Sequence, residues 1–220
     1  MPALAFIHTV ASLEPVFERL VREADPGIVV SHVVDERLLA EAIAAGTVPS
    51  ATEARLEAHA AAALAGGADL VVVTCSSMGN ATERVAARHG WPLSRIDEAM
   101  ADAAIETGSR IGVVATLRST LDPTADLVRR RAGNRTVQVT ARVADGAFAA
   151  LKAGDVARHD ELVRQALRAT LASADVVVLA QASMARVADS LGGGAGGTPI
   201  LASPALGVAR AVARLRAPAG

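Results

Sequence analysis

A single cysteine ends an apolar run in the stretch ADLVVVTCSSMGN, residues 68–80. A thiol at such a position could act as a nucleophile or a general base, because the N-terminus of a following helix lowers a thiol pKa and the thiolate is the reactive form. Cys75 could equally be inert packing, since cysteine is among the most buried residue types. The flanking Thr74, Ser76 and Ser77 favour the reactive interpretation, because a core would carry valine or leucine there.

An internal repeat places a different residue at the position equivalent to Cys75. The segment ADLVVVTCSSMG (68–79) aligns without gaps on ADVVVLAQASMA (174–185), with Gln181 opposite Cys75 and Ser183 opposite a serine. An amide has no proton to shuttle near neutral pH, but it can hydrogen-bond a carboxylate or an enolate oxygen. The two aligned segments therefore predict an asymmetric pair of site residues.

Two further segment pairs support the repeat. LAFIHTV (4–10) aligns on IGVVATL (111–117), and SLEP (12–15) aligns on TLDP (120–123), so that all the pairs share an offset of 106 to 108 residues. Matching turn residues at a common offset indicate two similar halves, each about a hundred residues long, which is ordinary domain size. We expect the first half to span 1–97 together with a C-terminal helix at 205–220, and the second half to span 98–204.

Short β-branched runs alternate with helical patterns along the chain. We expect strands at Leu4–Val10, Ile28–Val34, Leu70–Thr74, Leu93–Ile96, Ile111–Thr116, Val137–Val143, Val176–Ala180 and Pro199–Ala202. We expect helices at Ser12–Ala24, Thr52–Ala65, Asn80–His89, Asp97–Thr107, Leu121–Arg131, His159–Ala172 and Ala205–Arg216. Strands that are apolar throughout are covered on both faces, which predicts an α/β fold of two Rossmann-like or flavodoxin-like halves with parallel sheets, related by a pseudo-twofold.

Polar residues follow the expected strands where ligands bind in such sheets, at the carboxyl ends. We expect substrate to bind in a cleft between the two halves, to Thr9, Thr74, Ser76, Ser77, Thr116, Ser119, Thr120 and Ser183. His8, at the end of the first strand, is a weaker candidate for a catalytic role. Hydroxyl and backbone N–H donors of this kind suit a small carboxylate, which they bind without a permanent counter-charge.

Composition excludes several classes of function. The chain has 220 residues and a net charge of −1, with scattered arginines and few aromatic residues, so we expect no nucleic-acid partner. The N-terminus has no signal-peptide pattern and no window is apolar enough to span a membrane, which favours a cytoplasmic protein with no membrane partner. One cysteine allows no internal disulfide and no cysteine-based metal cluster.

No organic cofactor is expected either. Lys152 is the only lysine and lies in a helical pattern away from any strand end, whereas pyridoxal phosphate needs a lysine for its Schiff base. There is no G-K-[ST] phosphate loop, and the glycine run 192–197 does not stand between a strand and a helix, so we interpret it as a surface loop.

The chain resembles the aspartate/glutamate racemase superfamily, which includes hydantoin racemases, maleate cis-trans isomerases and arylmalonate decarboxylases. The resemblance rests on Thr74-Cys75-Ser76-Ser77, on IHTV and on the segments 115–120 and 179–184. In the racemases, a cysteine from each half works on opposite faces of the carbon next to a carboxylate. The resemblance implies that Cys75 is the first of these, that the substrate is a small carboxylate or amino acid, and that the protein is a homo-oligomer.

Gln181 departs from that family pattern, because it stands where the second cysteine would be. A symmetric two-thiol mechanism is therefore excluded. Racemisation needs a second acid, such as His8 or a hydroxyl, whereas cis-trans isomerisation or bond cleavage fits one thiol more simply. A decarboxylase or lyase, or a non-catalytic carboxylate-binding paralogue, remains the alternative.

Other polar residues are expected to have structural roles. Asp35 reads as the cap of a helix and His159-Asp160 as a helix start. Asn80 with Glu83 has the spacing of a capping box, and Ser119 or Thr120 could cap the helix expected from Leu121.

Overall fold

The computed structural model describes residues 1–191 and 197–217, so most of the glycine run lies outside the described residues. The chain divides into two compact units. Unit 1 contains 1–97 and 204–220, and unit 2 contains 98–203. Each unit is built around one four-stranded parallel sheet.

The sheet of unit 1 has the strand order β2-β1-β3-β4. Its strands are β1 (Ala3–His8), β2 (Val29–Val34), β3 (Leu70–Val73) and β4 (Leu93–Arg95). The two central strands are almost entirely buried, as the apolar runs in the sequence require of a sheet covered on both faces. All pairings are parallel, so the carboxyl ends of the strands meet at one edge.

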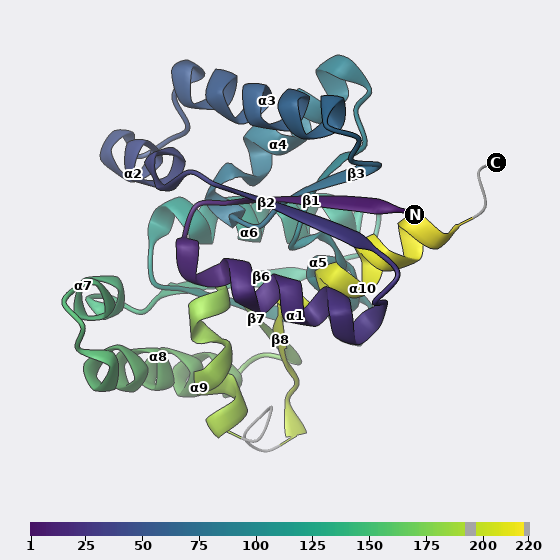
Figure 1. Cartoon of the computed structure of the whole chain (residues 1–220). Helices are drawn as coiled ribbons and strands as arrows, with labels where there is room; N and C mark the ends of the chain where they lie inside the picture. The colour runs from purple at the N-terminus through teal and green to yellow at the C-terminus, as the bar shows by residue number, and fades with distance from the viewer. Residues whose placement is uncertain (192–196, 218–220) are drawn as a thin grey trace. The chain divides into compact units, whose positions relative to one another are not determined.

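Helices cover both faces of this sheet (Figure 1). One face packs against α2 (Glu36–Ala45), α3 (Ser50–Ala65) and α4 (Gly79–His89) through β1 and β3 side chains such as Ile7 and Val73. The other packs against α1 (Glu14–Ala24) and α10 (Ser203–Arg216) through Phe6 and Val72. Successive strand residues point to opposite faces, which explains this division.

The last helix belongs to the first sheet. Val208 and Ala211 of α10 are buried in the cluster that holds Phe17 of α1, and Arg216 Nε donates to Asp25 Oδ2 at 2.6 Å. Gly207 lets α10 approach closely, since a Cβ there would lie 2.4 Å from the Ile96 backbone oxygen.

Unit 2 repeats the topology, with the strand order β6-β5-β7-β8. Its strands are β5 (Arg110–Ala115), β6 (Gln138–Val143), β7 (Val176–Leu179) and β8 (Ile200–Ala202), and its helices are α5 (Glu98–Thr107), α6 (Arg118–Ala132), α7 (Ala147–Lys152), α8 (Val156–Leu171) and α9 (Ala185–Ser190). Helices α7, α8 and α9 pack on one face around Val177 and Leu179, while α5 and α6 pack against β7 and β5. The prediction of an α/β fold with two similar halves is confirmed.

Each of the eight expected strands is present, whereas two expected helix caps are wrong. Helix α6 begins at Arg118 after Leu117, so Ser119 and Thr120 lie inside its first turn and cap nothing. Asn80 does not cap α4, because the helix begins at Gly79 after Met78. Asn80 and Glu83 instead both accept hydrogen bonds from the buried Arg95.

Of the two other expected helix starts, the one at Asp35 is confirmed and the one at His159 is placed too late in the sequence. Asp35 does cap α2, accepting from Arg37 N at 3.1 Å. Helix α8 begins earlier than expected, with Asp155 as its cap, so that His159 is buried within its first turns. His159 Nδ1 contacts Asp160 Oδ1 at 2.7 Å.

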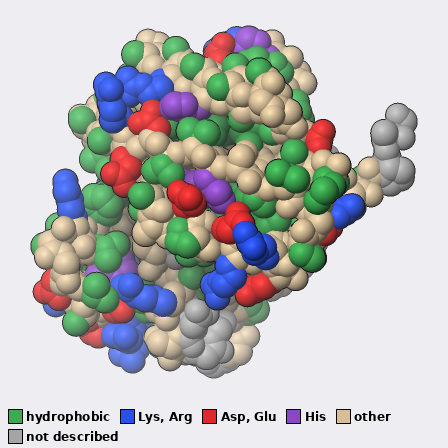
Figure 2. Space-filling model, in the orientation of Figure 1, with side chains coloured by type: hydrophobic (Ala, Val, Ile, Leu, Met, Phe, Trp, Pro, Cys, Tyr) green, Lys and Arg blue, Asp and Glu red, His purple; other side chains and the backbone are tan. Residues whose placement is uncertain are grey.

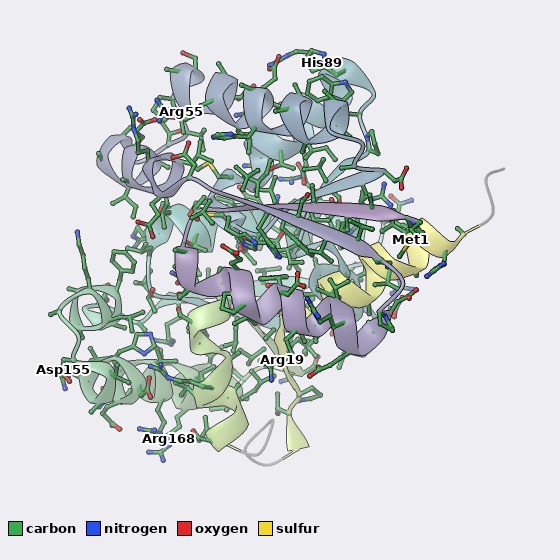
Figure 3. All side chains as sticks on the ribbon, in the orientation of Figure 1. Met1, Arg19, Arg55, His89, Asp155 and Arg168 are labelled. Atoms are coloured by element: carbon green, nitrogen blue, oxygen red, sulfur yellow. The ribbon has the colours of Figure 1, made fainter. Side chains whose placement is uncertain are left out.

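Charged side chains form ion pairs between neighbouring helices at the surface. Arg55, labelled on α3 in Figure 3, donates to Glu41 of α2 at 2.9 Å. On the face drawn in Figure 2, acidic and basic side chains are interspersed. Within the described residues, no helix is long and apolar enough to cross a membrane.

Candidate functional site

Cys75 occupies the turn between β3 and α4. The strand ends at Val73, Cys75 keeps an extended backbone (φ −110°, ψ 113°), and the short 3₁₀ turn of Ser76–Met78 leads directly into the helix. This geometry turns backbone N–H groups toward the sulfur: those of Ser77 and Met78 donate to it. The hydroxyls of Ser77 and Thr9 also hydrogen-bond it.

Burial raises the pKa of the Cys75 thiol above its ordinary value. Hydrogen bonds from Thr9, from the Met78 and Ser77 N–H groups and from the Ser77 hydroxyl lower that pKa, but less than burial raises it. The N–H groups at the helix N-terminus therefore lower the thiol pKa, as expected, but the net shift of that pKa is upward. Cys75 rests as a neutral thiol surrounded by donors that would stabilise its thiolate, and it remains partly exposed.

Gln181 occupies the same turn of unit 2, between β7 and the 3₁₀ turn Ala182–Met184. Its Oε1 accepts from Thr116 N at 2.6 Å and from Thr116 Oγ1 at 2.8 Å. Because a backbone N–H can only donate, these contacts fix the orientation of the amide, with oxygen toward Thr116 and Nε2 as the outward donor. Gln181 can thus donate to an oxygen of a ligand but cannot exchange a proton with it.

The two turns make equivalent contacts. Thr9 bonds Cys75 in unit 1, and Thr116, its counterpart in the repeat, bonds Gln181 in unit 2. The sequence alignment of the halves therefore extends to the hydrogen bonds at the ends of their sheets. What differs is the chemistry held there, a thiol in one half and an amide in the other.

His8 and Thr74 point away from Cys75. Both lie on the α1 face of the sheet with Phe6, whereas Cys75 packs on the α3 and α4 face, because strand residues alternate between faces. His8 Nδ1 lies 2.9 Å from Thr74 Oγ1, and Thr74 Oγ1 donates to Ile7 O at 3.2 Å. These interior contacts occupy both side chains, so the structure does not place Thr74 as a substrate ligand or His8 as an acid beside the thiol.

The remaining predicted residues lie at the ends of the same strands. Ser76 and Ser77 are buried in the Cys75 turn, and Thr120 is buried in the first turn of α6. Ser183 is half-buried in the turn after Gln181. Among the described residues, the Ser119 hydroxyl is buried with no hydrogen-bond partner, which leaves it able to bind a ligand or a water.

Within the described residues, no three His, Cys, Asp or Glu side chains gather as a metal ion would require. The chemistry available at these turns is that of one thiol, several hydroxyls, an oriented amide and backbone N–H groups. Such groups can take and return a proton and can bind an anion.

Residues 6–211 match the family described as Asp/Glu/hydantoin racemase, which covers most of the chain. The chain belongs to this family. Its resemblance to the aspartate/glutamate racemase superfamily is therefore confirmed. No curated protein sequence matches it.

Solved structures share the fold of this racemase-family chain at low sequence identity. A candidate Asp/Glu racemase from Yersinia pestis has a TM-score of 0.78 and 17% identity, with 98% of this chain and 99% of that chain covered. The allantoin racemase from Klebsiella pneumoniae has a TM-score of 0.69 and 16% identity, covering 98% and 89%. An arylmalonate decarboxylase has a TM-score of 0.60 and 15% identity, covering 99% and 94%.

Sequence reasoning missed two residues of the first unit of this family member. His32 on β2 and Glu18 on α1 continue the contacts of His8, at 2.9 Å and 3.1 Å. The only signal was a histidine inside the β-branched run VVSHVV, which is an unusual residue for a strand interior.

We expect His8 to make the stability of unit 1 dependent on pH. Burial, followed by the charge of His32, lowers the pKa of His8 from 6.5 to about 4. Between these values the unfolded state binds more protons, so the free energy of unfolding falls as the pH drops from about 7 to about 4, by up to about 3 kcal/mol from His8.

Urea unfolding of wild type and His8→Asn at both pH values measures this. Trp91, the single tryptophan, stacks on His89 beside β4 and reports on unit 1. The pH-dependent loss should be smaller in His8→Asn. An equal loss in both proteins would assign the effect to the carboxylates instead.

Proposed function

We propose that this chain is a cofactor-independent enzyme of the racemase or isomerase type, acting at or next to the α-carbon of a small carboxylate or amino acid. Cys75 is the proposed general base or nucleophile. The observation that carries the proposal is the ring of donors around the sulfur: two backbone N–H groups and two hydroxyls stabilise the charge of a thiolate that burial disfavours.

The proposed chemistry begins with transfer of the thiol proton to solvent, to which Cys75 is partly exposed. The thiolate then removes the α-proton or adds to the substrate, and Ser76, Ser77 and the nearby backbone N–H groups stabilise the developing negative charge. A carbon acid is activated in this way without metal or organic cofactor. The proposal needs only groups that this turn brings together.

Gln181 has a different role in the proposal. Its Oε1 is held by Thr116, so its Nε2 would donate to a carboxylate or enolate oxygen of the substrate. It supplies no second acid. A reaction with one proton transfer, such as isomerisation or cleavage, is therefore simpler for this chain than a symmetric racemisation.

A second candidate is a decarboxylase or lyase, and it is favoured by the same observation on Gln181. A carbon–carbon bond cleavage needs one proton delivered to one face of the product carbanion, which one thiol can do. Carboxylate binding without turnover is the third outcome, since an oriented amide and hydroxyls would still hold an anion. Assembly as a homo-oligomer stays a prediction.

The test is proton exchange in deuterium oxide. Wild type and Cys75→Ala are incubated with a panel of small dicarboxylates and amino acids, and NMR follows α-deuteration and the appearance of products. Deuteration or turnover that requires Cys75 supports the enzyme. Binding of a panel member without either, unchanged in Cys75→Ala, would establish the carboxylate-binding alternative.

We expect Gln181→Glu to lower kcat/KM by about 10- to 100-fold. The glutamate can still accept from Thr116, but its outward oxygen is an anionic acceptor where the substrate oxygen needs a donor, and a hydrogen bond to a charged group is worth about 1.5–3 kcal/mol. Steady-state kinetics on the substrate found above measure the change.

Gln165→Glu is the matched control for this substitution. Gln165 is exposed on α8 and bonds Glu161, so the same change of charge there should leave kcat/KM within about twofold. Equal effects of the two substitutions would show that net charge, and not the position of Gln181, controls the reaction.

A further inference from the structure

A threonine at the end of the first strand is repeated in both units. Thr9 follows β1 in unit 1 and Thr116 follows β5 in unit 2, and the two align in the internal repeat. Both residues lie in the interior, with 3% and 5% of their surface exposed. The sequence predicts both as substrate ligands, but each hydroxyl already has a partner within its own unit.

The hydroxyl of Thr116 donates to Gln181. The backbone N–H and Oγ1 of Thr116 both contact Oε1 of Gln181, at 2.6 and 2.8 Å. Because the N–H can only donate, Oε1 is the acceptor, and the hydroxyl must donate to it as well. A hydroxyl has a single proton to donate, and an ionised carboxylate can only accept. Thr116 therefore has no proton left for the carboxylate of a substrate.

Thr9 makes the equivalent contact in unit 1, where its hydroxyl hydrogen-bonds the sulfur of Cys75. A neutral thiol could donate or accept in this contact, but a thiolate can only accept. When Cys75 loses its proton to solvent, the Thr9 hydroxyl must therefore donate to the sulfur. The hydroxyl proton stays on Thr9, and only the direction of the O–H bond changes. In that state Thr9, like Thr116, has no proton left for a substrate carboxylate.

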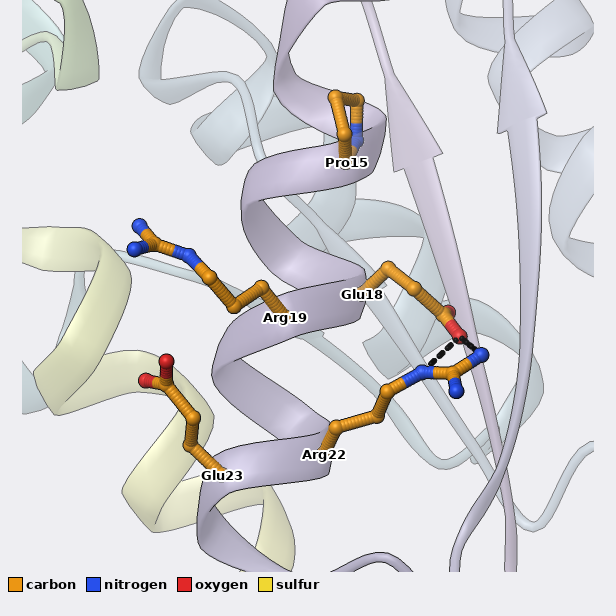
Figure 4. Close-up of a pocket in the computed structure, with 5 residues that line it drawn as sticks. All are labelled: Pro15, Glu18, Arg19, Arg22 and Glu23. Carbon is orange, nitrogen blue, oxygen red and sulfur yellow. Dashed lines mark hydrogen bonds and ion pairs between the residues drawn. The ribbon is translucent and has the colours of Figure 1, made fainter.

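Neither threonine lines the hollow drawn in Figure 4. Every residue that lines this hollow belongs to α1, and these residues are Pro15, Glu18, Arg19, Arg22 and Glu23. None of them lies in the turn that follows β1 or β5. The hollow therefore gives no reason to place a ligand against either hydroxyl.

We propose that Thr9 and Thr116 are positioning residues, which orient the functional side chain of each turn and do not bind substrate. Thr9 stabilises the charged sulfur of Cys75, and Thr116 keeps the amide of Gln181 turned so that Nε2 faces outward. The threonine is the shared element of the two turns, and the residue that it orients gives each turn its chemistry. This inference rests on the proposed function for the roles of Cys75 and Gln181, but it is tested without turnover.

The first test is a titration of Cys75 in the full chain, followed by the ultraviolet absorbance of the thiolate. The chain has one cysteine and no tyrosine, so no phenolate absorbs in the same range. Among the described residues, the groups that hydrogen-bond the sulfur are uncharged. Thr9→Val should raise the midpoint by about one pH unit, because the thiolate loses one of these donors. Thr9→Ala should do the same, and Thr9→Ser should keep the midpoint of wild type.

Alkylation of Cys75 at one fixed pH, below both midpoints, measures the same effect without a titration to high pH. The rate should fall about threefold in Thr9→Val, since the tenfold smaller thiolate fraction is partly offset by the greater nucleophilicity of a more basic thiolate. Thr52→Val is the matched control, because Thr52 is also buried in unit 1 and its hydroxyl donates to Glu41 at 2.6 Å. It should change neither the midpoint nor the rate. Trp91 fluorescence checks that each variant is folded.

The second test follows the side-chain amide of Gln181 by ¹⁵N NMR, with the resonances assigned by their absence in Gln181→Glu. Thr116→Val should shift these resonances, because one of the two donors to Oε1 is lost, and Thr116→Ser should restore them. The two threonines also control for each other. Thr116→Val should leave the thiol midpoint unchanged, and Thr9→Val should leave the Gln181 resonances unchanged.

Equal thiol midpoints in Thr9→Val and Thr52→Val would overturn the role of Thr9. Gln181 resonances that do not change in Thr116→Val would overturn the role of Thr116. On a substrate found by proton exchange, Thr9→Val should lower kcat and leave KM within about twofold, whereas a raised KM with unchanged kcat would make Thr9 a substrate ligand. If the thiol and the amide behave as expected while no substrate exchanges its α-proton or turns over, the proposed function fails and the positioning roles stand.

Discussion

Replacing Cys75 by serine is expected to lower the rate of α-proton exchange by about 10³-fold. The hydroxyl can take over the hydrogen bonds with Thr9 and Ser77, so the turn keeps its shape. It cannot take over the chemistry, because an alcohol gives up its proton far less readily than a thiol, and a positioned acid or base contributes about 10²–10⁴-fold. Exchange rates of wild type and Cys75→Ser on the same substrate measure the loss.

Stability separates this loss from a folding defect. The free energy of unfolding should change by less than about 1 kcal/mol in Cys75→Ser, since the polar neighbours of the thiol accept a hydroxyl. Ser173→Ala, an exposed substitution at the end of α8, should change neither quantity. Exchange that persists in Cys75→Ser within tenfold of wild type would remove the thiol from the reaction.

Replacing Asp97 by asparagine is expected to destabilise unit 1 by about 3–5 kcal/mol. The side chains of Arg95 and Asp97 are both 0% exposed and form a paired contact, with distances of 2.6 and 2.9 Å. Removing one partner leaves a buried guanidinium short of its counter-charge, which costs about that much. Glu83 also contacts Arg95 but is partly exposed, so it compensates only in part.

The neighbouring glycine shows how tightly Arg95 is held. A Cβ on Gly79 would lie 2.1 Å from Arg95 Cζ, so the guanidinium packs directly against the backbone at the start of α4. Urea unfolding followed by Trp91 fluorescence measures the effect. Asp126→Asn, which breaks an exposed ion pair with Arg129, should cost less than about 1 kcal/mol. Similar losses in the two variants would show that Arg95 finds another partner.

The strands were predictable because their signal is strong. Apolar β-branched runs on both sides of polar turns required a parallel sheet covered on both faces, and the internal repeat required that sheet twice. The equivalence of Cys75 and Gln181 in the two halves could also be predicted from the internal repeat. The structure agrees, because Thr9 hydrogen-bonds Cys75 and its counterpart Thr116 hydrogen-bonds Gln181.

The side-chain partners were less predictable, because they depend on which face a residue occupies. The sequence did not reveal that His8 points away from the thiol and toward His32. That orientation depends on where β1 ends and on its register with β2, which the residue types alone do not determine. The cap assignments at Asn80 and Ser119 failed for a related reason. In both cases the helix begins before the expected cap, so that the side chain lies within the first turn.

The most direct test of the central claim is alkylation of Cys75 in the folded protein against pH, followed by intact mass. The chain has one cysteine, so a single added group reports only that thiol. We expect native protein to be alkylated at a rate that rises with pH and has its midpoint above that of an ordinary thiol, because burial raises the pKa of Cys75, and a carboxylate that binds the turn should slow it. A thiol that reacts only after unfolding would contradict the account and make Cys75 a packing residue.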